Sequence, residues 1–152
     1  MIVGLISDTH GLLRPQALKH LAGSELIIHA GDVGKPEILK ALSEIAPVVA
    51  IRGNVDTSPE LLLLPQTAIV EADSKRIYVV HSIAEVDLDP AAAGFDAVVF
   101  GHSHKRDLYT KSGVMYINPG SAGPRRFRLP ISLALLNTGR DPMETTFLKI
   151  EA

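Results

Sequence analysis

The chain has no cysteine among its 152 residues. Disulfide bonds, thiolate zinc sites and cysteine nucleophiles are therefore excluded, and any bound metal must take oxygen and imidazole ligands. The chain also lacks an excess of basic residues, because its formal net charge is −2 at pH 7. This charge argues against general nucleic-acid binding.

Long hydrophobic runs are absent as well. The first apolar segment, 2–6, has no basic region before it and is interrupted at once by Asp8 and His10. It is too short for a signal peptide or a membrane span. We therefore expect a cytoplasmic protein with no membrane partner. No polar linker divides the sequence, so residues 1–152 are expected to form a single domain with a substantial core.

The first third of the chain alternates between strand and helix patterns. The runs 2–6, 26–30 and 48–51 are apolar and typical of buried strands. Between them, 14–21 and 37–45 carry apolar residues at helical spacing. This order predicts a parallel sheet with right-handed crossovers.

From residue 57 onward the pattern changes to hairpins. The leucine run 61–64 is expected to be a turn or short strand covering the core, and 90–93 a short helix. A buried strand is expected at 97–100, and hairpins at 68–72 with 76–80, 107–111 with 114–117, and 131–137 with 145–150. A βαβ half followed by a mostly antiparallel half predicts two sheets packed face to face, with helices outside.

Five of the predicted strands end in side chains that can bind a metal ion. These are Asp8 with His10, Asp32, Asn54, His81, and His102 with His104. In open α/β sheets, ligands bind beyond the carboxyl ends of the strands. One such motif is more often a turn or a helix cap, but chance does not account for five together. We interpret them as one site.

The ligand types in this site suit two divalent ions: two aspartates, one asparagine, four histidines and no sulfur. Asp32 follows Gly31, which allows a close turn, and is a plausible bridging carboxylate. Two divalent ions less two carboxylates leave a charge of about +2, which a bridging hydroxide lowers to about +1. That surplus suits an anionic phosphoryl group, so the pattern indicates phosphate ester hydrolysis.

The order of these motifs resembles the calcineurin-like metallophosphoesterase family, and most closely its small bacterial and archaeal phosphodiesterase branch. The motifs are Asp8-x-His10, Gly31-Asp32, Gly53-Asn54-x-Asp56, His81, Gly101-His102-Ser103-His104 and the loop Asn118-Pro119-Gly120-Ser121. The resemblance implies the metallo-dependent phosphatase fold, a four-layer α/β sandwich of two packed mixed β-sheets flanked by helices.

The resemblance also implies a dinuclear phosphoesterase in which a metal-bridging hydroxide attacks phosphorus in line with the leaving oxygen. The implied ligands are Asp8, His10, Asp32 and His104 for one ion, and Asp32, Asn54, His81 and His102 for the other. Mn²⁺ is the expected ion, with Ni²⁺, Zn²⁺ or Fe as alternatives. The expected partner is a small-molecule phosphoester, a diester rather than a monoester.

Within this site, Asp32, Asn54 and Asp56 are predicted to be catalytic, and Asn54 and Arg125 to bind substrate. One departure from the family matters for catalysis: a histidine thought to protonate the leaving group usually follows the motif asparagine, and here that position is Val55. General acid catalysis typically contributes ~10²–10⁴-fold, so poor leaving groups should react slowly. In the family that histidine is paired with the acid that follows it. Here Asp56 has no such partner and is left to order the loop. Ser82 replaces a glycine common in relatives.

Two further features have alternative interpretations. We expect His29 to be a buried histidine hydrogen-bonded to the backbone rather than a partner of a metal ligand. The arginines of 124–128 either bind an anionic substrate or form a solvated or subunit-contact strip. A homodimer through this strip or the hairpins is left open by the sequence.

Three other functions differ in how well they fit this pattern. A phosphomonoesterase of the same fold is the nearest. A non-catalytic interaction scaffold, resembling the phosphoesterase-fold subunit of the retromer coat, is disfavoured because the ligand set is complete. A barrel-type metal hydrolase needs ~250 residues and is excluded by length.

Overall fold

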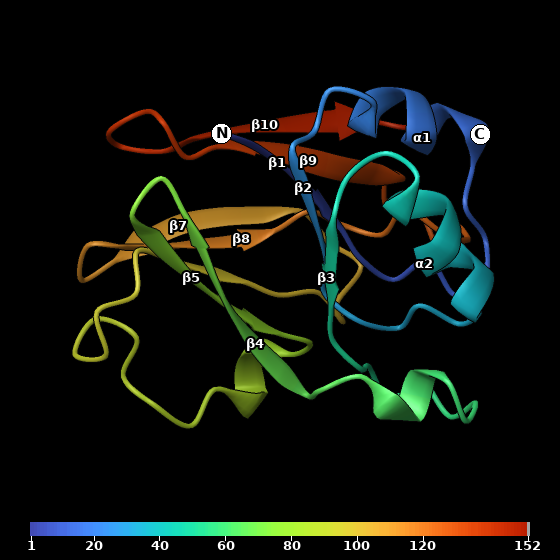
Figure 1. Cartoon of the computed structure of the whole chain (residues 1–152), viewed down its shortest axis with the longest axis horizontal. Coiled ribbons are helices and arrows are strands. Elements are labelled where there is room, and N and C mark those ends of the chain that lie inside the picture. Colours follow the sequence, from blue (N-terminus) through green and yellow to red (C-terminus); the bar gives the residue numbers. More distant parts are fainter. Residues whose placement is uncertain (152) are drawn as a thin grey trace.

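Two five-stranded sheets form the body of the computed structural model, which describes residues 1–151 (Figure 1). The first sheet has the order β10-β9-β1-β2-β3. Its strands are β1 (Ile2–Ile6), β2 (Leu26–His29), β3 (Val48–Ala50), β9 (Ser132–Asn137) and β10 (Glu144–Lys149). The strands β1, β2 and β3 are parallel, and β9 and β10 extend the sheet antiparallel.

The second sheet has the order β4-β5-β6-β8-β7. Its strands are β4 (Thr67–Ala72), β5 (Lys75–Val80), β6 (Ala97–Val99), β7 (Asp107–Lys111) and β8 (Val114–Asn118). The three predicted hairpins are confirmed, but the second sheet is not mainly antiparallel: β5, β6 and β8 run parallel, and only the edge strands β4 and β7 are antiparallel. The third hairpin, β9 and β10, joins the first sheet instead.

Both α-helices cover the outer face of the first sheet (Figure 1). Each of α1 (Pro15–Leu21) and α2 (Pro36–Ser43) begins with proline, which lacks the N–H that a first helical turn leaves unpaired. Apolar residues of each helix pack on the sheet in one buried cluster. No helix in residues 1–151 combines the length and apolar character needed to cross a membrane.

The outer face of the second sheet is covered by the segment 82–96. It contains the 3-10 turn η2 (Ile83–Glu85), and Phe95 packs on Tyr78 of β5 with ring centroids 5.2 Å apart. Residues 90–93 form a turn rather than the predicted short helix. The leucine run forms η1 (Leu61–Leu63), in which Leu61 is buried and covers the core as expected.

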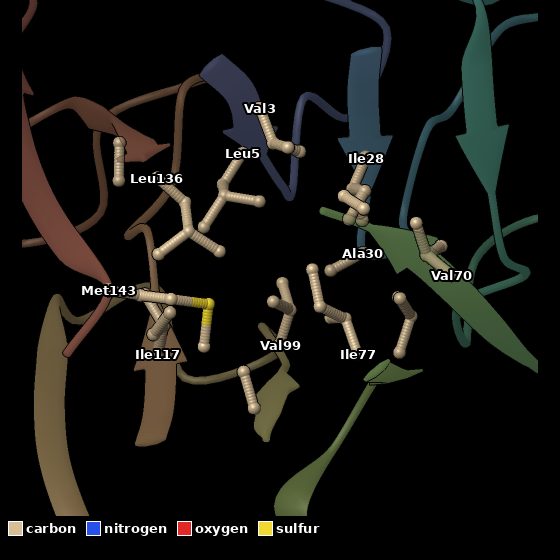
Figure 2. Packing of buried hydrophobic residues seen from close by; sticks show 14 of the residues in the cluster. Val3, Leu5, Ile28, Ala30, Val70, Ile77, Val99, Ile117, Leu136 and Met143 are labelled. Atoms are coloured by element: carbon tan, nitrogen blue, oxygen red, sulfur yellow. The ribbon is translucent and has the colours of Figure 1, made fainter. Parts of the chain in front are cut away.

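The inner faces of the sheets pack against each other through aliphatic side chains (Figure 2). Val3, Leu5 and Ile28 of the first sheet meet Ile77 and other side chains of the second. Both sheets contribute strands that end at the same edge, so this packing fixes how far apart their end loops lie.

Replacement of Ile77 by alanine should test this core. Ile77 has no exposed surface, and Ile69 in the same hairpin is 57% exposed. Loss of a buried isoleucine side chain typically costs about 2–5 kcal/mol, whereas Ile69→Ala should cost less than about 1 kcal/mol. Urea denaturation of the two variants measures both values, and equal losses would contradict the described packing.

Candidate metal centre

The loops that follow β1, β2, β5 and β6 are hydrogen-bonded to one another beyond the strand ends. Asp8 N–H donates to the Gly31 carbonyl at 3.0 Å, and His10 N–H donates to the Asp32 carbonyl at 2.9 Å. In the second sheet, Gly101 N–H donates to the His81 carbonyl at 2.8 Å. The backbone therefore holds the candidate ligands of each sheet in fixed register.

Five of the candidate ligands have left-handed backbone conformations. Their φ angles lie between 46° and 74°, and the residues are Asp8, His10, Asp32, His102 and His104. Non-glycine residues rarely adopt this region, which costs on the order of 1–3 kcal/mol each. Strain gathered at one edge of the molecule indicates a functional constraint on that edge.

Glycines allow the two sheets to meet closely here. A Cβ atom on Gly101 would collide with the side chain of Ser7 and lie 2.7 Å from Asp8 Oδ2. A Cβ atom on Gly53 would collide with the backbone and carboxylate of Asp32. These glycines bring the loops of β6 and β3 against the two aspartates.

The first group of ligand atoms comprises Asp8, His10 and His104. His10 Nε2 lies 3.2 Å from His104 Nε2 and 3.7 Å from Asp8 Oδ1, and His104 Nε2 lies 3.5 Å from Asp8 Oδ1. Tetrahedral ligands at bond lengths of about 2.1 Å are about 3.4 Å apart. The spacing therefore fits one divalent ion.

The second group comprises Asp32, His81 and His102. His81 Nε2 lies 3.1 Å from Asp32 Oδ2, and the rings of His81 and His102 meet edge to face at 5.2 Å. Asp32 Oδ2 is also 3.7 Å from His10 Nε2 of the first group. This oxygen thus lies between the two groups, where a bridging ligand is needed.

Each aspartate has one oxygen held by hydrogen bonds and one facing the histidines. Asp8 Oδ2 accepts from Ser7 Oγ at 2.7 Å and from His102 N–H at 3.1 Å, while the buried Oδ1 has no hydrogen-bond partner. Asp32 Oδ1 accepts from Val55 N–H at 3.0 Å. The carboxylates are oriented in advance, and an unpaired buried oxygen fits a cation as its partner.

His81 is oriented in the same way. Its Nδ1 donates to the Ala30 carbonyl at 2.8 Å, which leaves the buried Nε2 to face the aspartates without a hydrogen-bond partner. Such a bond fixes the tautomer of a metal-binding histidine. Without metal, burial opposes the charged form of His81, but the Asp32 carboxylate, the Ala30 carbonyl and the charge of Asp8 together outweigh burial and raise the pKa of His81 to about 9. A metal ion would replace that proton.

Asn54 and Asp56 lie in the loop after β3. The exposed Asn54 makes no side-chain hydrogen bond within residues 1–151 and stands between Gly53 and Val55, which both contact Asp32. Asp56 is buried and accepts from three backbone N–H groups, those of Val33, Gly34 and Gly53. These contacts tie the loops after β2 and β3 together. The catalytic role of Asp56 remains a prediction.

His29 is buried, and its Nδ1 accepts from Gly31 N–H at 3.1 Å, which confirms the expected backbone bond. Thr9 Oγ1 donates to the Val33 carbonyl, so it accepts from His29 Nε2 at 3.0 Å. Burial lowers the pKa of His29 to about 4. The neutral imidazole therefore links the Asp8–His10 loop to the Asp32 loop, a role that the sequence did not reveal.

Residues 124–128, which hold three arginines, follow Gly123, where a Cβ atom would collide with the carbonyl oxygen of Thr9. Arg125, Arg126 and Arg128 are all exposed. The charge of Arg126 is among the influences that lower the pKa of His10 and His104, although the Asp8 carboxylate prevails at His10 and burial is the larger cause at His104. Arg125 is the arginine predicted from sequence to bind substrate, with no separate role for Arg126, because neighbouring arginines in a loop look alike in sequence.

Comparison with known proteins gives consistent results. A model of the calcineurin-like phosphoesterase superfamily domain matches residues 1–141. A probable metallophosphoesterase of Methanocaldococcus jannaschii is 32% identical, with 99% of this chain and 82% of that protein covered.

Two solved structures show the same fold. An archaeal phosphodiesterase superposes with a TM-score of 0.85 at 23% identity, covering 99% of this chain and 100% of that chain. Vps29 of Entamoeba histolytica, solved in complex with Zn²⁺, superposes with a TM-score of 0.76 at 18% identity, covering 98% and 99%.

The state of His29 predicts a pH dependence of stability. Between pH 6.5 and 4 the unfolded chain binds a proton at His29 that the folded chain does not, so stability is full above pH 6.5 and falls as the pH drops toward 4. Glutamine does not titrate. From pH 7 to pH 4, the advantage of wild type over His29→Gln should shrink by about 3 kcal/mol in urea denaturation with chelator present. A constant difference would contradict the neutral buried imidazole.

Proposed function

The chain belongs to the calcineurin-like phosphoesterase superfamily, and we propose that it is a dinuclear metal-dependent phosphodiesterase. The observation that carries this proposal is the position of Asp32 Oδ2, 3.1 Å from His81 Nε2 and 3.7 Å from His10 Nε2. One carboxylate oxygen between two groups of ligands suits a pair of ions sharing a bridge. The proposed substrate is a small-molecule phosphoester.

The proposed ligands are Asp8, His10, Asp32 and His104 for one ion and Asp32, His81, His102 and Asn54 for the other. Mn²⁺ is the proposed ion, and Ni²⁺, Zn²⁺ or Fe are alternatives that the same oxygen and nitrogen donors would accept. When bound, such ions lower the pKa of water and offset charge on the phosphoryl oxygens.

The chain's own groups orient these parts. Val55 N–H and the bonds to Asp8 Oδ2 hold the two carboxylates, so the site needs little reorganisation when a substrate binds. The exposed amide of Asn54 lies at the same loop and is proposed to donate to a phosphoryl oxygen.

Val55 favours diesters with good leaving groups over monoesters. Its side chain is 48% exposed beside Asp32 and cannot supply a proton. The nearby Asp56 is occupied by three backbone N–H groups. A leaving group that is stable as an anion needs no proton from the protein, whereas a poor one does.

A non-catalytic interaction scaffold is the second candidate, favoured by the likeness of fold to Vps29, a vacuolar protein sorting protein. Because the compared Vps29 structure contains Zn²⁺, metal binding does not separate the two functions. Only a hydrolysis measurement does so.

Hydrolysis of an aryl phosphodiester by chelator-stripped protein, before and after addition of Mn²⁺, tests the function. Activity should appear only with metal. Asp32→Ala should abolish it and lower the metal content measured by mass spectrometry, because both groups lose a carboxylate oxygen. Asp87→Ala, an exposed aspartate in the 82–96 segment, is the matched control. Wild-type rates in Asp32→Ala would refute the site, and inactivity with every candidate ion would favour the scaffold.

Val55→His should selectively improve poor leaving groups. An imidazole at this half-exposed position places a proton donor beside Asp32, and we expect kcat/KM for an alkyl ester or a monoester to rise about 10-fold or more relative to a nitrophenyl diester. Because Asp56 already accepts three backbone N–H groups and is not free to orient the imidazole, the gain can start below the usual ~10²–10⁴-fold of general acid catalysis. Val55→Ala controls for loss of the valine. The same selectivity in both variants would contradict this explanation.

A further inference from the structure

All five residues of β7 are exposed, and this strand forms one edge of the second sheet. An edge strand presents unpaired N–H and C=O groups that can bind another strand, and proteins usually block it with a proline, a bulge or an inward-pointing charge. Strand β7 contains no proline, and its register with β8 is unbroken. Its charges stand only at its two ends, and Leu108 and Tyr109 between them are 45% and 38% exposed. This edge is therefore open to a partner strand.

The turn between β7 and β8 determines which backbone groups of β7 face β8. Ser112 and Gly113 both have positive φ angles, 52° and 79°, as the two central residues of a type I′ hairpin turn do. Lys111 and Val114 are opposite each other and flank this turn, so they form a hydrogen-bonded pair. The backbone N–H and C=O of Lys111 are thus directed at β8.

Hydrogen-bonded pairs alternate along an antiparallel ladder. Counted back from Lys111, Tyr109 and Asp107 also direct their backbone groups at β8, whereas Leu108 and Thr110 direct theirs away from the sheet. Within residues 1–151 no loop or side chain forms a hydrogen bond with the backbone of Leu108 or Thr110. These two residues supply the free backbone groups of the edge.

The sequence of β7 is complementary to itself when two copies run antiparallel about Tyr109. Leu108 then lies opposite the partner's Thr110, and each such pair exchanges two N–H···O bonds because both residues face outward. Asp107 lies opposite the partner's Lys111, so that an opposite-charge pair stands at each end of the contact. Neither Asp107 nor Lys111 forms an ion pair within residues 1–151.

The charges select this register over its neighbours. A shift by two residues in either direction also matches the outward-facing groups, but it brings Lys111 opposite the partner's Lys105 or the partner's Tyr109. Like charges directly opposite each other are destabilising. Only the register centred on Tyr109 places opposite charges in both end pairs.

Strand β10, an edge of the first sheet, does not have this property, although it also begins with an acid and ends with a base. Glu144 and Lys149 are an odd number of residues apart. Two copies of one strand can pair only residues an even number apart, because alternate residues face the partner. The self-complementarity is therefore specific to β7 when these two edges are compared.

The geometry points to a homodimer in which the β7 strands of two copies pair antiparallel about Tyr109 and join their second sheets into one continuous sheet. The partner that this surface fits is a second copy of this chain. The Tyr109 ring is already held in place by stacking on Tyr116, with ring centroids 4.9 Å apart and planes at 4°. Side chains of a non-hydrogen-bonded pair come closest together, so the two Tyr109 rings meet at the twofold axis.

Charge variants test the dimer by light scattering and sedimentation. Wild type should have twice the chain mass of 16.3 kDa. Lys111→Asp places carboxylates opposite each other at both ends, and the association constant should fall about 10-fold or more. The double variant Asp107→Lys with Lys111→Asp restores the pairs and should dimerise as wild type does. Lys149→Glu, an exposed lysine at the end of β10, is the matched control and should not change the dimer.

Single cysteines test the register, because the chain has none of its own. The Cα atoms of a non-hydrogen-bonded pair are about 4.5 Å apart, within the range of a disulfide. Tyr109→Cys should therefore cross-link to its own copy when a mild oxidant is added, as a non-reducing gel shows. Lys111→Cys lies about 13 Å from the same residue of the partner and should not cross-link.

Four outcomes would overturn the proposal. They are a wild type that is monomeric at every concentration up to its solubility limit, a Lys111→Asp variant that dimerises like wild type, a folded double variant that stays monomeric, and equal cross-linking of the two cysteine variants. Circular dichroism establishes that each variant is folded. Hydrolysis plays no part in these measurements, so they test the dimer independently of the proposed function.

Discussion

The negative charge of two buried carboxylates is the constraint on which this structure depends. Asp8 has no exposed surface and Asp32 very little, yet both are surrounded by imidazoles rather than by lysine or arginine. Burial of an unpaired carboxylate is costly, so the charge must be offset within the site. Without metal, the proton of His81 offsets part of it, since the pKa of His81 is raised to about 9. Metal ions offset it more fully and use the same atoms. The site is thus organised for cations before any substrate is present.

The surrounding fold keeps these charges together against the strain that this requires. Left-handed turns at five candidate ligands cost free energy, and they persist because backbone hydrogen bonds and the packed sheets leave no alternative. The second sheet supplies His81, His102 and His104, while the first supplies both aspartates and His10. The aliphatic core between the sheets (Figure 2) therefore sets the distance between carboxylates and imidazoles. In this molecule the core and the site are consequences of the same packing.

Much of this arrangement could be predicted from sequence, because strand ends and ligand types are local signals. The apolar runs, the hairpin turns and the polar residues after each run identified the site and most elements. The partner of each strand could not be predicted: β9 pairs with β1 across more than 120 residues, and no local pattern encodes that choice.

The same limit applies to side-chain partners. Two of the three N–H groups bound by Asp56, those of Val33 and Gly34, and the bond between Thr9 and His29 arise only when distant loops meet. The short helix expected at 90–93 is a turn, although its proline suited a first helical turn.

Metal binding and catalysis are separable properties of such a site, because different residues determine them. The ligands lie at strand ends that the whole fold holds in place, whereas Val55, Asn54 and Arg125 lie in loops whose side chains reach solvent. A change in a ligand alters buried charge and so affects stability. A change in one of the exposed loop residues leaves the buried charges as they are and alters only the side chains that contact the substrate. Proteins with this fold can therefore keep a metal-binding site while their chemistry changes, which is consistent with a Zn²⁺ complex of Vps29 and a phosphodiesterase among the fold's solved structures.

Valine at position 55 is a change in an exposed loop residue: it offers no proton donor but retains the backbone N–H that orients Asp32. Under the proposed function, the chemistry left to the site is charge stabilisation by cations, which suffices for leaving groups that depart as anions.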